Sequence, residues 1–441
     1  MQQNYDQVFR DIPSYTRFLQ VREIDELTHQ IVQLPGVRHR IVGQTMDKEP
    51  LHLLDIGTGE HTALILGVPH SDEPLGSLVI TFFARWLALH PEVNSYGWRW
   101  LFIPMVERRG MQLNEGWFTM PDSFAALAKS TFREPTEDQY EWTRSRPETQ
   151  AVQHVIEKEQ PDLLCALHHC GFHNAYFYIS EDFPQIYEPL RSLAASVRLP
   201  LSDSAPDVPF GHMFSPGFYH MYGLRDYLDY YQKKDPAFLT TLKRGACSDE
   251  WYHQKVSGFS FNCEVPMYLS SKLQDKTPSD KRYKHVMQER YHRKKRRVKY
   301  SIHLINIIRN YSDLADPLLL DVAEKHVVNA QISLDHEKKI LDHLEDKSMT
   351  MAEVFENEVL VDLFDLFFLG QLWRVAESIC IKGGAPSICQ LMDTIDIEIK
   401  TLAKSVQDRG GFYQLPIRSM VKMQLGSILY IAQALQHKEK H

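Results

Sequence analysis

Coordinating and acidic residues follow three short apolar stretches of the sequence. His70 and Glu73 follow the first, a histidine pair at 168 and 169 follows the second, and Glu264 follows the third. Two imidazoles and one carboxylate are a common ligand set for catalytic zinc, which keeps one position for water. A further carboxylate beside that water can take its proton, since zinc lowers the pKa of the water to about 7. This combination suits the hydrolysis of an amide or an ester.

The stretches before these residues have the composition of buried strands. We expect strands over 51–57, 61–68, 98–106, 161–169, 175–180 and 257–266, and helices over 74–91 and 148–160. Residues 1–40 are interpreted as helix and lead-in. The alternation predicts an α/β fold with a mixed sheet flanked by helices. Because functional groups collect at the carboxyl ends of strands in such sheets, the three sets are expected in one crevice.

The spacing of His70 and Glu73 is interpreted as that of a turn. Pro69 and Pro74 bracket the segment, so a strand-to-helix turn is expected to direct both side chains into one crevice. An H-x-x-E pair taken alone is more often two surface residues. Its position between an apolar strand and a long apolar helix strengthens the metal interpretation.

Four segments resemble the metallocarboxypeptidase family of zinc peptidases, and they occur in the order that the family has. They are GVPHSDEPLGS, IPMVERRGMQLNEGW, PDLLCALHHCGFHNAYFYIS and GACSDEWYHQKVSGFSFNCEVP, within about residues 15–275. The resemblance implies one zinc ion per chain, held by His70, Glu73 and His168, with Glu264 as the general base. It implies a mixed sheet of the eight-stranded type flanked by helices, and a peptide or small amide as the substrate.

Each of these assignments has an alternative. His168 and His169 are neighbours, so on a strand they point to opposite faces, and the one that is not a ligand is packed or solvated. His168 matches the position of the family's ligand. Glu264 could be an ordinary carboxylate at a strand end, but an unpaired charge after an apolar strand would be costly, which favours a catalytic role. Cys165 and Cys170 have poor spacing for a Cys/His metal site.

The substrate-binding residues depart from the family pattern. The Asn-Arg pair with which the family holds a terminal carboxylate corresponds to Asn114 and Glu115, and a glutamate repels a carboxylate at short range. Glu115 could instead meet a substrate ammonium. Arg108 and Arg109 are candidates for the arginine that stabilises the oxyanion, although a solvated turn explains them equally well.

The family's mobile tyrosine is also unplaced, and Tyr219 and Tyr222 are candidates for it. An aromatic-rich segment such as the one around Tyr219 is more often packing than part of a site.

Composition and charge exclude several classes of protein. The chain has 441 residues, 43% of them hydrophobic, and a net charge of −8. The length and hydrophobic content are enough for a large core. The negative net charge gives no overall attraction to nucleic acid or anionic membranes. No window approaches about 18 uncharged apolar residues, so no membrane partner is predicted. With no signal-peptide pattern and no CxxC pair, we expect six reduced cysteines and a cytoplasmic location.

The composition changes near residue 275, where a polar, proline-bearing linker begins. Helical periodicity follows, with no convincing strand. We predict a catalytic domain over 1–275 and an all-helical domain over 285–441 that acts as a cap or supports a homo-oligomer. The basic run HRKKRRVKY at 292–300 could be a nucleic-acid patch, but a solvated or interface face is favoured because the chain is acidic and no nucleic-acid partner is expected.

These features together predict a zinc-dependent hydrolase of the metallocarboxypeptidase type that cleaves an amide or peptide bond. The alternative is a catalytically silent binding or scaffold protein with the same fold. Departures at Glu107–Gly110, Gln112 and Glu115 motivate that alternative. Retention of all three ligand positions and of Glu264 argues against it.

Overall fold

The computed structural model describes residues 5–121, 123–133, 145–203, 208, 210–234, 246–341 and 343–438. The chain divides into two compact units. The first, called the sheet unit, comprises Met1–Gln112, Thr136–Met267 and Leu415–His441, and the second, the helical unit, comprises Leu113–Pro135 and Tyr268–Gln414. The sequence predicts one passage between domains, near residue 275, whereas the chain passes between the units four times.

The sheet unit is built on a mixed sheet of nine strands among the described residues, in the order β1-β2-β4-β3-β5-β9-β6-β8-β7. The strands are β1 (Val37–Gln44), β2 (Pro50–Ile56), β3 (His61–Leu66), β4 (Trp98–Ile103), β5 (Leu163–Ala166), β6 (Tyr176–Ile179), β7 (Met213–Ser215), β8 (Phe218–His220) and β9 (Phe259–Glu264). Strands β4, β3, β5 and β9 are mutually parallel, so their carboxyl ends meet at one edge. The predicted mixed sheet is confirmed, with nine strands in place of the expected eight.

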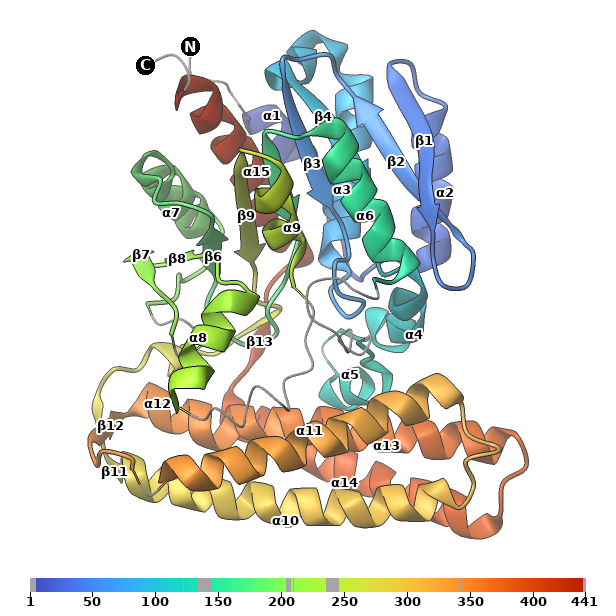
Figure 1. Ribbon diagram of the computed structural model, residues 1–441, viewed down its shortest axis with the longest axis vertical. Coiled ribbons are helices and arrows are strands. Elements are labelled where there is room, and N and C mark those ends of the chain that lie inside the picture. Colours follow the sequence, from blue (N-terminus) through green and yellow to red (C-terminus); the bar gives the residue numbers. More distant parts are fainter. Residues whose placement is uncertain are drawn as a thin grey trace. The chain divides into compact units, whose positions relative to one another are not determined.

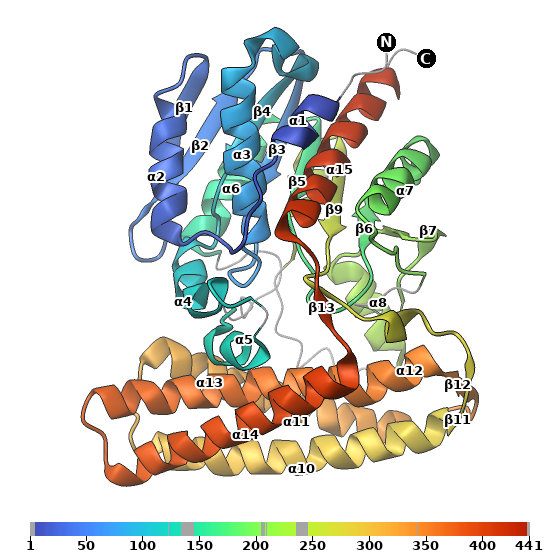
Figure 2. The same cartoon turned by 180° about the vertical axis from the view of Figure 1, so that it is seen from behind.

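Helices cover both faces of this sheet. α6 (Pro147–Glu159) and α9 (Ser248–Lys255) lie on one face (Figure 1). α2 (Val21–Val32), α3 (Leu75–Leu89) and α15 (Ile417–Lys438) lie on the other (Figure 2). Further helices of this unit are α1 (Asp6–Asp11), α7 (Tyr187–Ser196) and α8 (Leu224–Lys234), with 3-10 turns η1 (Pro91–Gly97) and η3 (Pro184–Ile186). Because both faces are covered, the central strands are continuous apolar runs.

The face under α6 carries the even-numbered residues of β3 and β5. Leu64, Leu66, Leu164 and Ala166 pack with α6 residues such as Val155 in one buried cluster. Because side chains alternate along a strand, the odd-numbered residues of β3 and β5 point to the α3 and α15 face. This parity decides which residues beyond the strand ends share a face.

The helical unit contains four long helices that lie side by side (Figures 1 and 2). They are α10 (Tyr283–Arg309), α11 (Pro317–Leu341), α13 (Val361–Ile381) and α14 (Pro386–Gly410), accompanied by α5 (Phe124–Ser130), α12 (Met351–Phe355), the π-helical turn η6 (Glu356–Leu360) and the 3-10 turn η5 (Ser271–Gln274). α4 (Arg108–Phe118) runs from the sheet unit into this unit. No helix in the described ranges has the length and apolar character needed to cross a membrane.

Short strands also occur in the helical unit. β11 (Pro278–Arg282) pairs with β12 (Ser348–Thr350), and β10 (Tyr268–Leu269) pairs with β13 (Tyr413–Gln414). The expectation of no strand after residue 275 is therefore wrong for β11, β12 and β13. Strands of two to five residues carry too few alternations to produce a pattern in the sequence.

The basic run at 292–300 lies on α10, where part of it is paired inside the helical unit. Arg297 forms an ion pair with Asp365 at 3.2 Å, Arg293 with Asp362 at 3.7 Å, and Lys294 contacts Glu337. The remaining basic side chains Lys295, Arg296 and Lys299 are exposed. One side of the run thus packs against acidic partners and the other is solvated.

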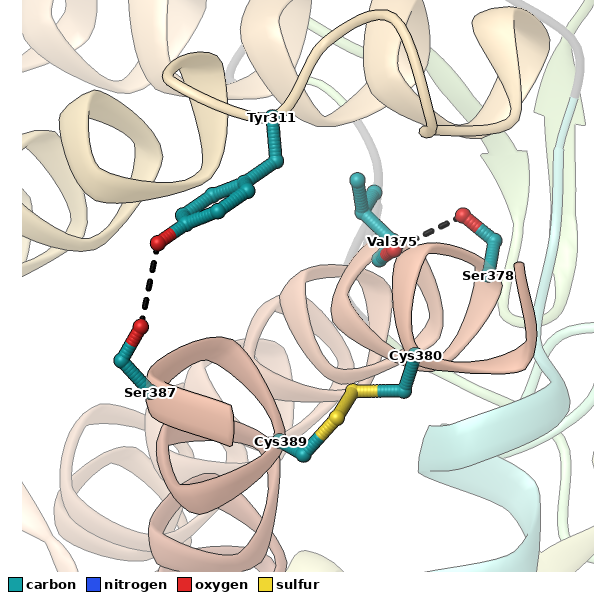
Figure 3. The surroundings of a disulfide bond; sticks show 6 residues. All are labelled: Tyr311, Val375, Ser378, Cys380, Ser387 and Cys389. Carbon is teal, nitrogen blue, oxygen red and sulfur yellow. Dashed lines mark hydrogen bonds between the residues drawn. A yellow bond between two sulfur atoms is a disulfide. The ribbon is translucent and has the colours of Figure 1, made fainter. Parts of the chain in front are cut away.

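Cys380 and Cys389 form a disulfide that joins the end of α13 to the start of α14, with Cα atoms 5.7 Å apart (Figure 3). The expectation of six reduced cysteines is therefore wrong for this pair. The tight connection between the two helices brings the two residues together, which spacing alone does not reveal. Among the described residues the free thiols are Cys165, Cys170, Cys247 and Cys263.

Candidate metal centre

The chain bends sharply between the end of β3 and His70. Val68 has a φ of 50°, which is unusual for a β-branched residue because its side chain crowds the backbone there. Backbone hydrogen bonds hold this bend: the N–H of Val106 donates to Gly67 O at 2.9 Å, and that of Glu107 to Val68 O at 3.0 Å. Strained backbone of this kind concentrates at functional sites, where surrounding structure imposes it.

A four-residue turn then brings His70 and Glu73 together. The N–H of Glu73 donates to the carbonyl of His70 at 3.1 Å, and α3 begins directly after Pro74. The first and fourth residues of such a turn are neighbours in space. Nδ1 of His70 accordingly lies 2.9 Å from Oε1 of Glu73. The H-x-x-E spacing is that of a turn between a strand and a helix.

His168 reaches the same carboxylate from the neighbouring strand. β5 ends at Ala166, and Nδ1 of His168 lies 2.8 Å from Oε2 of Glu73. Gly76 allows this approach, because a Cβ at that position would lie 2.8 Å from the Cβ of Leu167. The start of α3 can therefore pack directly against the segment that carries His168.

The ligand atoms of His70, Glu73 and His168 all lie within 4.8 Å of one another. In the part of the chain that the structure describes, this is the one group of three or more histidine, cysteine or acidic residues arranged in this way. The Glu73 side chain is 6% exposed and that of His168 13%, whereas that of His70 is 42% exposed. Two imidazoles and a buried carboxylate fit a zinc ion. The centre is open to solvent on the His70 side.

His169 points away from this centre, as alternation along the chain requires. Its side chain is buried, and its ring stacks on Phe18 with the planes 12° apart. The structure thus brings His168 to the carboxylate and packs His169 into the opposite face of the sheet.

Glu264 is the last residue of β9, which lies next to β5. The parallel ladder of β5 and β9 ends at the pair Ala166 and Asn262, two residues before His168 and Glu264, and Glu264 itself pairs with Tyr176 of β6. Glu264 has the same parity as Asn262, whose partner Ala166 lies on the α6 face. The preceding Cys263 is buried, which raises the pKa of its thiol to about 12 and keeps it neutral.

The two candidate arginines differ in their surroundings. Arg108 donates to Oδ2 of Asp25 at 2.7 Å and lies 3.9 Å from Glu49. Arg109 is half-buried, and among the described residues no hydrogen bond or ion pair of its side chain is found. Arg108 is thus held by the acidic side chains around α2, while Arg109 remains available at the start of α4.

Asn114 and Glu115 belong to the helical unit. Asn114 is buried, and its side-chain amide forms two hydrogen bonds with the backbone of Phe132. Its Nδ2 donates to the carbonyl at 2.7 Å, and its Oδ1 accepts from the N–H at 2.9 Å. Trp117 also donates to Oδ1, at 3.2 Å. Glu115 is half-buried, and Gln112 in the sheet unit is exposed. The substrate roles of Asn114 and Glu115 stay predictions.

Tyr219 lies on β8 inside an aromatic cluster with Tyr176 and Tyr178. Its hydroxyl donates to the carbonyl of Ser202 at 3.1 Å, and burial raises its pKa. Its substrate role also stays a prediction.

Sequence reasoning misses one residue that touches the backbone of the centre. Gln424, in α15, is fully buried, and its Nε2 donates to the carbonyl of His168 at 2.5 Å. The signal in the sequence is a single amide inside the apolar helical run MVKMQLGSILYIA. A buried polar side chain in such a run must find hydrogen-bond partners.

No protein-family model and no curated protein matches the chain. Among solved structures, it is similar to a candidate metallopeptidase from Shewanella amazonensis, with 14% identity, a TM-score of 0.39, and coverage of 56% of this chain and 84% of that one. Bovine thrombin-activatable fibrinolysis inhibitor, solved with tick carboxypeptidase inhibitor, gives 12% identity, a TM-score of 0.36, and coverage of 56% and 86%. A metallo-carboxypeptidase from Burkholderia cenocepacia gives 17% identity and a TM-score of 0.33, with coverage of 56% of this chain and 60% of that one.

Proposed function

We propose that this protein is a zinc-dependent hydrolase of the metallocarboxypeptidase type that cleaves an amide or peptide bond. The observation that supports this most directly is the placement of the Glu73 carboxylate between two imidazoles, 2.9 Å from His70 and 2.8 Å from His168. The three residues follow the carboxyl ends of the neighbouring parallel strands β3 and β5. Sites of this kind at a strand edge can admit a substrate carbonyl.

The residues have separate roles in the proposal. His70, Glu73 and His168 would hold the zinc ion, which, when bound, polarises a carbonyl and activates water at neutral pH. Glu264 accepts a proton from the attacking water and later returns it to the leaving amine. The buried Glu73 carboxylate directs one oxygen to each of the two imidazoles.

Substrate recognition rests on charged groups outside this centre. Arg109 is the better candidate to meet an anionic group, because Arg108 is already held by Asp25. Glu115 takes the place of the arginine that binds a terminal carboxylate in the family, and it would favour a substrate ammonium over a carboxylate. The substrate we propose is therefore a peptide or small amide that differs from a plain C-terminal peptide.

The test is the Glu264→Gln variant, assayed against a panel of N-acyl amino acids, blocked peptides and peptides with free termini. We expect zinc binding to be unchanged and hydrolysis to fall by about 10²–10⁴-fold, the usual contribution of a general base. Glu157→Gln, an exposed glutamate on α6, is the matched control and should hydrolyse within about twofold of the wild type. Hydrolysis by Glu264→Gln at the wild-type rate would refute the proposed role of this residue.

A further inference from the structure

A buried amide on α15 connects the two strands that carry the candidate ligand and the candidate base. Gln424 is fully buried, and its Nε2 donates to the carbonyl of His168 at 2.5 Å and to that of Cys263 at 3.5 Å. Cys263 directly precedes Glu264. A single side chain thus contacts the backbone at both strand ends of the proposed site.

These contacts lie where the ladder between β5 and β9 ends. The last paired residues are Ala166 and Asn262, so the backbone beyond them is outside the ladder that aligns the two strands. At this point the Gln424 amide donates a hydrogen bond to one carbonyl that follows β5 and to one carbonyl of β9. The orientation of the amide is fixed by hydrogen bonding. If the amide group rotated by about 180°, its oxygen would face the two carbonyl oxygens, and neither could receive a hydrogen bond.

Gln424 approaches from the face of the sheet that α15 covers. The hydroxyl of Ser427, one turn further along α15, lies 3.6 Å from the sulfur of Cys263. Because side chains alternate along β9, Cys263 points toward α15 and Glu264 points to the other face. The hydrogen bonds of Gln424 are to the backbone carbonyls of His168 and Cys263, so it acts on the site through the backbone.

We infer that Gln424 is a positioning residue that holds the backbone of His168 against that of Cys263, and that by orienting the ligand His168 it raises the affinity of the centre for zinc. This inference rests on the proposed function. Hydrogen-bonding groups outside the coordination shell orient ligands, and their loss lowers metal affinity by about 10–100-fold. The same range is expected here, since the amide holds the peptide unit of a ligand.

The chain offers a matched control on the same helix. Gln436 also lies on α15, and its Nε2 donates to the carbonyl of Tyr96 at 3.1 Å. Tyr96 belongs to η1, which precedes β4 at the amino-terminal edge of the parallel strands, away from their carboxyl ends. The two glutamines therefore make the same kind of bond at opposite ends of the sheet.

The experiment measures zinc affinity by competition with a chromophoric chelator, using the full chain and the variants Gln424→Met and Gln436→Met. Methionine keeps the length of the side chain and removes the donor. We expect about 10-fold or weaker zinc affinity for Gln424→Met and a change within about twofold for Gln436→Met. If Gln424→Met fails to fold, Gln424→Leu, which is smaller and also lacks the donor, is measured in its place.

The outcomes separate this inference from the proposed function. Equal zinc affinity in wild type and folded Gln424→Met would overturn the role of Gln424 and leave the metal centre standing. Equal losses of zinc affinity in Gln424→Met and Gln436→Met would also overturn it, because the loss would then result from a general weakening of the packing of α15. A wild-type protein that binds no zinc would overturn both proposals.

Discussion

Oε2 of Glu73 lies 2.8 Å from Nδ1 of His168, although 95 residues separate the two in the sequence. The other oxygen of the same carboxylate lies 2.9 Å from Nδ1 of His70. One buried side chain therefore joins the turn after β3 to the segment after β5. The candidate centre exists only when both strands occupy their places in the sheet.

The first prediction separates the two neighbouring histidines. His168→Ala should abolish stoichiometric zinc binding, because it removes one of three ligands. His169→Ala should keep the zinc, because that ring packs on Phe18 at the other face, and should cost stability only. Zinc content after dialysis, measured on both folded variants, decides between them. Loss of zinc in His169→Ala with retention in His168→Ala would contradict the assignment.

The second prediction separates the two neighbouring arginines. Arg109→Gln should lower kcat/KM by about tenfold or more for anionic substrates, since a charge-assisted hydrogen bond contributes about 1.5–3 kcal/mol. Arg108→Gln should leave kcat/KM unchanged and lower the free energy of unfolding, because it removes the partner of Asp25. Steady-state kinetics and urea unfolding of both variants check this. An unchanged KM for Arg109→Gln with every anionic substrate would remove Arg109 from the site.

The third prediction concerns pH and the helical unit. Burial lowers the pKa of His326 to about 4, and its ring stacks on Phe368 with centroids 4.4 Å apart. An unfolded chain binds this proton with a pKa of about 6.5, so between these values only the unfolded state is protonated. Stability should therefore fall as pH falls from about 6.5 to 4, by at most about 3 kcal/mol.

Urea unfolding at pH 7.5 and pH 4.5 tests this for wild type and His326→Leu. Other groups titrate equally in both proteins, so the difference between them isolates His326. The variant should lose less stability than the wild type on acidification. Parallel losses would show that His326 does not carry the effect.

The fourth prediction concerns the disulfide between Cys380 and Cys389. Alkylation of the unfolded, unreduced protein should modify the four free cysteines and spare this pair. Cys380→Ser should destabilise the helical unit by about 2–3 kcal/mol, the entropy of closing a short loop. Reductant should reproduce this loss in the wild type and have no effect on the variant. Modification of all six cysteines without reductant would contradict the pairing.

The sequence predicts the central strands closely. β3 occupies His61–Leu66 within the predicted 61–68, and β9 occupies Phe259–Glu264 within the predicted 257–266. Strands buried on both faces are continuous apolar runs between turns, which makes them easy to recognise. β1 is missed because its sequence, VRHRIVGQ, lies at the sheet edge and is nowhere fully buried.

The site is predictable only where its geometry is local. Residue types and two prolines indicate the turn of His70 and Glu73, and the family resemblance supplies His168. Gln424 and the disulfide pair escape prediction because they depend on where α15 and α13 return in space. The disulfide also removes part of the reason for expecting a cytoplasmic chain, since the six cysteines are not all reduced.

The most direct test is metal content by plasma mass spectrometry, on wild type and on His70→Ala prepared under identical conditions. We predict about one zinc ion per wild-type chain and the loss of that ion in the variant. Wild-type protein that holds no zinc, even after incubation with zinc, would contradict the proposal of a zinc-dependent hydrolase. The protein would then be interpreted as a binding or scaffold protein with this fold.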